Sequence, residues 1–73
     1  MTEASAKAIS DLMVSMGTQL TESLGMVEDS ESKEDFVRYQ TAVSILLTDM
    51  LTEIMNPLYR EHPQLQPPEL ESA

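Results

Sequence analysis

The sequence has no cysteine, no tryptophan and only two glycines among its 73 residues. Without cysteine, disulfides and thiolate metal sites are both excluded. With so few glycines there is no glycine-rich loop to hold a phosphate group. A chain of this length forms one small domain at most, and at this size an independently folded core is marginal without a partner.

Basic residues and long apolar runs are also scarce. Four Lys and Arg residues face thirteen Asp and Glu residues, and the net charge of −9 argues against direct binding to the phosphates of DNA or RNA. The most apolar stretch, AVSILLTDMLTEIM, contains Asp49 and Glu53 and is far shorter than the roughly 20 apolar residues of a membrane span. The first ten residues lack the apolar run of a secretory signal. We therefore expect a cytoplasmic protein that does not bind membranes.

Apolar residues in the first part of the chain recur at steps of three and four, the spacing of one helix face. Thr2 is placed to cap the start of this helix, and Gly25 is placed to end it in the left-handed conformation. The pattern predicts a first helix over residues 3–24, with an apolar face of Ile9, Leu12, Met13, Met16, Leu20 and Leu24.

A second helix is predicted over residues 33–55. Ser32, followed three residues later by Asp35, resembles a capping box. Pro57 lacks an N–H and disfavours the helical conformation of Asn56, so the helix should break there or continue with a kink as far as residue 61. After Pro63 we expect an extended, proline-rich tail over residues 63–73, or one whose leucines, Leu65 and Leu70, fold back on the helices.

The fold class expected is all-α, an antiparallel two-helix hairpin over residues 1–62. The apolar positions of the second helix cover about half its circumference, more than one neighbouring helix covers. Leaving even a few such side chains in water costs several kcal/mol at about 25 cal/mol per Å². A homodimer that forms a four-helix bundle would bury them, and a different protein partner stays open. The predicted self-association face consists of Phe36, Val43, Leu47, Met50, Leu51, Ile54, Met55 and Leu58.

No residue cluster carries a catalytic, cofactor or metal signature. His62 is the only histidine, and neither helix has the Glu-x-x-His pair of bundle metal sites. Zinc shared by two copies of His62 across a dimer axis is the one metal site left open. A second candidate surface, for contact with a partner, consists of Tyr59, Arg60 and His62 at the end of the helical region.

These observations predict a small non-enzymatic protein-protein interaction module, a self-associating adaptor, regulator or accessory subunit. One alternative is an acidic inhibitor that imitates nucleic acid and occupies a basic protein. Another is a chaperone-like helper that shelters an apolar segment of a client against its methionine-rich face.

Overall fold

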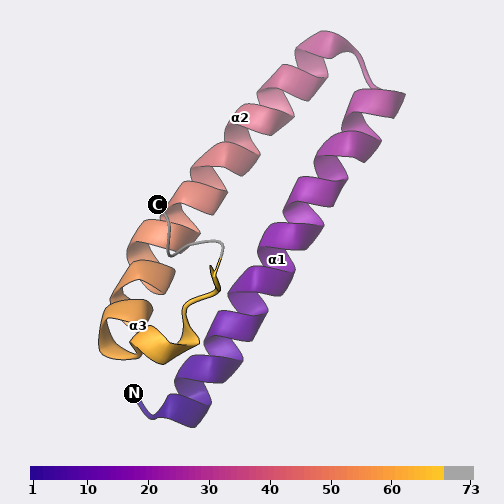
Figure 1. Ribbon diagram of the computed structural model, residues 1–73. Helices are drawn as coiled ribbons and strands as arrows, with labels where there is room; N and C mark the ends of the chain where they lie inside the picture. Colours follow the sequence, from indigo (N-terminus) through magenta and orange to yellow (C-terminus); the bar gives the residue numbers. More distant parts are fainter. Residues whose placement is uncertain (69–73) are drawn as a thin grey trace.

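The computed structural model describes residues 1–68, and in this part of the chain every regular element is helical (Figure 1). Two long antiparallel helices, α1 (Glu3–Ser30) and α2 (Lys33–Asp49), form a hairpin. After α2 come a π-helix, η1 (Met50–Met55), a short helix, α3 (Asn56–Glu61), and a 3-10 turn, η2 (Pro63–Leu65). The predicted all-α helical hairpin is confirmed.

Both long helices begin where their capping residues lie. The Thr2 hydroxyl accepts the Ser5 N–H at 3.2 Å, and the Ser32 hydroxyl accepts the Asp35 N–H at 3.1 Å. Each cap satisfies one of the N–H groups that have no partner within the helix. Because a cap depends only on residues three apart in the chain, these two starts were readable from sequence.

The end of α1 differs from its prediction. The helix continues through Gly25, which has a negative φ, and ends at Ser30 rather than Leu24. Glu31 then takes an extended conformation while its N–H still bonds the Val27 carbonyl at 2.9 Å. A glycine inside a helix costs only about 1 kcal/mol, and the additional turn of backbone hydrogen bonds and the half-buried Val27 offset that cost. The connection to α2 is therefore much shorter than predicted.

Gly25→Ala is expected to stabilise the protein by about 0.5–1 kcal/mol, because alanine favours the helix and nothing lies within 4 Å of the added methyl group. In a domain of this size, each kcal/mol raises Tm by about 4–8 °C. Thermal unfolding followed by circular dichroism at one protein concentration measures the change. A fall in Tm would mean that Gly25 ends the helix in the left-handed conformation instead.

Gly17 lies in the middle of α1 on the side of the partner helix. A methyl group placed there would lie 3.8 Å from Cδ2 of Leu47, an ordinary van der Waals distance. This spacing indicates that Gly17 weakens the helix locally and does not serve a close approach of the two backbones. Side chains therefore separate the backbones of α1 and α2 near Gly17.

The helical backbone continues through the region of Pro57 instead of breaking. Asn56 keeps helical angles (φ −61°, ψ −48°), and its N–H bonds the Leu51 carbonyl, five residues back. This wider π-type turn comes directly before the proline, which has no N–H to donate. It also changes the phase of the helix, so that Ile54 is exposed while Leu58, four residues later, is buried. The prediction that these two residues share a face is wrong for that reason.

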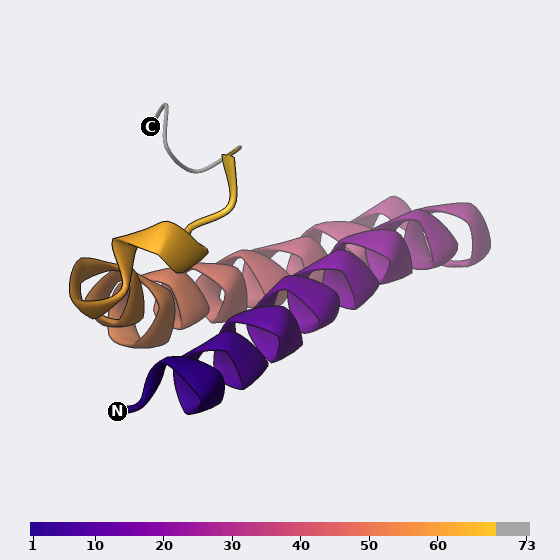
Figure 2. The same cartoon turned by 60° about the horizontal axis from the view of Figure 1, so that its bottom comes forward.

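The buried cluster lies at the open end of the hairpin, where α3 turns towards the first turns of α1 (Figure 1). Ala6, Leu58 and Tyr59 form its centre, and Leu65 packs against it together with Ile9 and Met55. Leu65 therefore folds back on the helices, whereas Leu70 lies outside the described residues. The first part of the predicted extended tail is instead a 3-10 turn, and Figure 2 shows the described C-terminal segment standing on one face of the hairpin.

Candidate interaction surfaces

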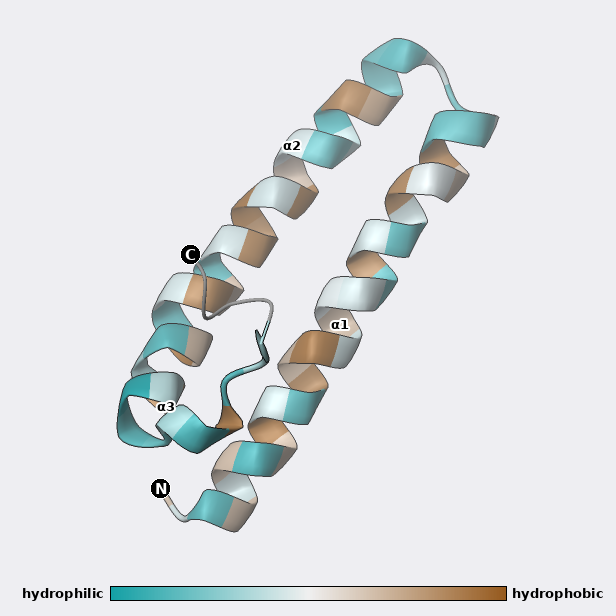
Figure 3. Ribbon diagram, in the orientation of Figure 1, coloured by the Kyte–Doolittle hydropathy of each residue, from teal (hydrophilic) through white to brown (hydrophobic). Residues whose placement is uncertain are grey.

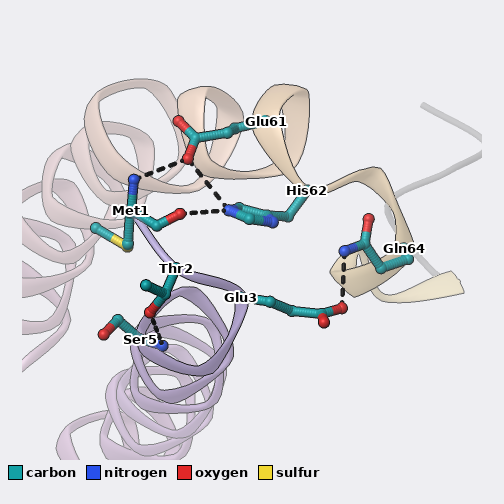
Figure 4. Close-up of polar contacts among 7 residues, drawn as sticks. All are labelled: Met1, Thr2, Glu3, Ser5, Glu61, His62 and Gln64. Carbon is teal, nitrogen blue, oxygen red and sulfur yellow. Dashed lines mark hydrogen bonds and ion pairs between the residues drawn. The ribbon is translucent and has the colours of Figure 1, made fainter.

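Polar contacts join the start of α1 to the end of α3 (Figure 4). The Met1 ammonium group lies 3.0 Å from Glu61 Oε1, and the Met1 carbonyl oxygen lies 3.0 Å from His62 Nε2. Gln64 Nε2 donates to Glu3 Oε1 at 2.8 Å. Both oxygen partners of His62 Nε2, the Met1 carbonyl and the Glu61 carboxylate, are acceptors, so this nitrogen carries the proton. We call these five residues the end clasp.

Glu61 makes the stability of the end clasp depend on pH. A hydrogen bond from the terminal ammonium group, and then its positive charge, lower the pKa of the Glu61 carboxyl. Because the folded-state pKa lies below the unfolded one, this stabilisation is complete above the ordinary glutamate pKa of about 4.3 and disappears as the pH falls through the folded-state value. Glu61→Gln should therefore lower Tm slightly near neutral pH and leave it unchanged in strong acid. Thermal unfolding of both proteins across the acid range measures this, and a constant Tm difference would contradict it.

Tyr59 is not part of a contact surface, which corrects the prediction. Only 5% of it is exposed, and its hydroxyl lies 2.5 Å from Oγ of Ser10 on α1. The η1 turn directs α3 towards α1, and a buried tyrosine needs a hydrogen-bond partner, which Ser10 supplies. Of the other two predicted contact residues, Arg60 is exposed and His62 is half-buried in the end clasp.

The structure divides the predicted self-association face among several environments. Val43, 1% exposed, and Leu58 are buried inside the hairpin, so neither is available to another chain. Leu51 and Ile54 are exposed. The other four members are half-buried: Phe36, Leu47, Met50 and Met55.

One side of the seam between α1 and α2 holds an apolar groove of about 530 Å³. Val14 and Thr18 line it from α1, Leu51 from η1, and Pro67 from the C-terminal segment. Glu22 brings a carboxylate to the same lining. We call it the Val14 groove, and it lies on the face where the C-terminal segment stands.

A second groove, of about 380 Å³, is lined by a different side of α1. Met16 and Ser23 line it from α1, and Tyr39 and Leu46 line it from α2. The Ser23 hydroxyl donates to the Leu20 carbonyl oxygen and therefore accepts the hydroxyl of Tyr39, 2.6 Å away. None of the residues that line this Met16 groove carries a carboxylate or a cationic side chain. None of the residues that line the Met16 groove belongs to the described C-terminal segment.

Sequence reasoning did not single out the flank of α1 that α2 leaves largely exposed. At 100° per residue, its six charged side chains fall within about one third of the helix circumference, between Glu28 on one flank and Glu22 on the other. On the side of the Met16 groove, α1 carries a row of uncharged residues that follow one another at alternating steps of three and four. We call this row the α1 strip; it consists of Ile9, Leu12, Met16, Gln19, Ser23 and Met26. The regular absence of charged residues along this row was the feature of the sequence that could have indicated the α1 strip.

Leu12 is 52% exposed, and Met26 is exposed further along the same strip. Leu12 belongs to the apolar face predicted for the first helix, and Met26 lies beyond the predicted end of that helix; α2 covers only one side of the face. Hydrophobic residues recur along both long helices in Figure 3, interrupted by polar ones. The hairpin therefore leaves part of its apolar surface without a partner within the described chain.

Among residues 1–68, no group of three or more His, Asp or Glu side chains is placed to hold a metal ion. In the same part of the chain, no helix is long and apolar enough to cross a membrane. No family model, no curated sequence and no solved structure matches this chain significantly.

Proposed function

We propose that the protein is a small non-enzymatic interaction module that self-associates, with a role as an adaptor, a regulator or an accessory subunit. The observation that supports this is the small core. Among the described residues, five hydrophobic residues are buried, while ten large hydrophobic residues are exposed. The buried set is Ala6, Met13, Val43, Leu58 and Tyr59.

A second chain would stabilise the fold, because a single hairpin buries little apolar surface. Ordering each residue costs about 1–2 kcal/mol of backbone entropy, and burial of apolar surface must offset this cost. A core of five residues buries too little apolar surface to offset this entropy cost well. Pairing two hairpins in a four-helix bundle buries more apolar surface and needs no other protein. The net charge of −9 limits how two copies can meet, because contact through charged surfaces would be repulsive.

Sedimentation equilibrium between about 1 μM and 1 mM tests the proposal directly, since dimers with Kd values in this range have binding free energies of about 4–8 kcal/mol. We expect a dimer mass at high concentration and a Tm that rises with protein concentration, because mass action stabilises the associated state. A monomer mass and a constant Tm across the whole range would contradict self-association.

The Val14 groove favours a second candidate, a helper that shelters an apolar client segment. Met13, Met50 and Met55 line it, and flexible thioether side chains adapt to varied partners. A monomer that binds an apolar dye, with Leu51→Glu reducing the dye signal, would favour this role. A dimer with little dye binding would favour the self-associating module.

A further inference from the structure

We infer that two copies of this chain pair through the α1 strip, with their α1 helices antiparallel across a twofold axis between Met16 and Gln19. The inference rests on the proposed self-association and specifies the surface and the geometry. In this arrangement the Met16 grooves of the two copies face each other. The Val14 grooves, with the C-terminal segments, point outward.

The spacing of the α1 strip fits helix pairing. From Ile9 to Met26 its residues follow steps of three, four, three, four and three, an average of 3.4, close to the 3.5 that keeps one seam facing a neighbouring helix. Ile9, Leu12, Met16 and Met26 supply the apolar side chains, and the remaining members are uncharged. The seam is about 26 Å long at 1.5 Å per residue.

Along α1, charge favours this surface over the other side of the seam. A second copy carries the same net charge of −9, so a stable contact must keep carboxylates apart. The lining of the Met16 groove has no charged side chain, whereas that of the Val14 groove includes Glu22. On α1 the ion pair of Lys7 with Asp11, 2.9 Å long, lies on the charged third of the helix and outside the α1 strip.

The size of the hairpin is compatible with such an interface. The two larger dimensions of the molecule are 44 and 21 Å, which limit one flat side of the hairpin to on the order of 900 Å². A standard stable interface buries about 800 Å² on each partner. Antiparallel pairing of the two α1 helices also brings their dipoles into the favourable relative orientation.

Met16→Glu and Val14→Glu test the surface as a matched pair, because both side chains are 40% exposed and lie on opposite sides of α1. Met16→Glu places a carboxylate from each copy beside the axis and should raise the dimer Kd about 100-fold or more. Val14→Glu should leave Kd within about threefold of wild type, a change of less than 1 kcal/mol. Sedimentation equilibrium measures Kd, and circular dichroism verifies that each variant is helical.

Cross-linking of single cysteine variants tests the antiparallel arrangement of the two α1 helices. The chain has no cysteine, so Leu12→Cys and Ser23→Cys each introduce a single thiol. In the antiparallel pair, Leu12 faces Ser23 of the second copy, whereas it lies about 16 Å along the axis from its own counterpart. A short bis-maleimide should therefore link a mixture of the two variants, while each variant alone stays mostly unlinked.

The outcomes separate this inference from the proposed function. A dimer that tolerates Met16→Glu, or that is broken by Val14→Glu instead, overturns the α1 strip but leaves self-association standing. Linking of Leu12→Cys to itself overturns the antiparallel arrangement. If Met16→Glu does not fold, the cross-linking of the mixed Leu12→Cys and Ser23→Cys variants alone decides whether two copies pair through the α1 strip. A wild-type protein that stays monomeric overturns both proposals.

Discussion

Leu58→Ala should lower the free energy of unfolding by about 2–5 kcal/mol. Leu58 is 8% exposed and packs with Ala6 and Tyr59 in the buried cluster at the open end of the hairpin. Ala6 is fully buried and too small to move into the space that the truncation leaves. In a domain whose whole stability is about 5 kcal/mol, the variant would keep about 3 kcal/mol at most. Urea unfolding at a fixed protein concentration measures the loss.

Ile45→Ala is the matched control for this experiment. Ile45 is also a large aliphatic residue in a helix, but it is 58% exposed on the outer side of α2. Its truncation should change the free energy of unfolding by no more than about 0.5 kcal/mol. Equal losses for Leu58→Ala and Ile45→Ala would mean that α3 does not pack on α1.

Tyr59→Phe should destabilise the protein by about 1–3 kcal/mol, because it leaves the Ser10 hydroxyl buried without its partner. Ser10→Ala should have a similar effect for the reciprocal reason. The double variant should lose clearly less than the sum of the two, because both members of the hydrogen bond are then gone. Chemical unfolding of the wild type and the three variants gives the coupling energy.

A coupling energy near zero in that cycle would contradict the contact between α1 and α3. It would instead support the original prediction of Tyr59 as a surface residue. Arg60→Ala, at an exposed position one residue further along α3, is the control and should be close to neutral. The cycle thus tests the largest disagreement between the sequence prediction and the structure.

The starts of the two long helices were predictable because each depends on local chemistry. Thr2 and Ser32 accept N–H groups three residues away, and the apolar spacing that follows each cap defines a helix face. The end of α1 was not predictable in this way. Gly25 has low helix propensity, but propensity is a weak tendency that packing against α2 overrides.

The candidate site was only partly predictable. Eight residues of the second helix were expected to meet another chain, and the hairpin buries two of them, Val43 and Leu58, within its own fold. The α1 strip was visible in the sequence as a regular row without charge, but an apolar helix face does not show which part of it a neighbour covers. That depends on the direction from which α2 approaches.

The sequence alone therefore determined the all-α class, the hairpin and the two capped starts, because hydrophobic periodicity and capping act between residues a few positions apart. Only the tertiary structure decided which individual side chains are buried and which are exposed. The π-type turn before Pro57 rotates α3, buries Tyr59 against Ser10 and separates Leu58 from the exposed Ile54. A change of phase over a few residues is small in local energy, but it redirects every side chain that follows, and long-range packing selects it.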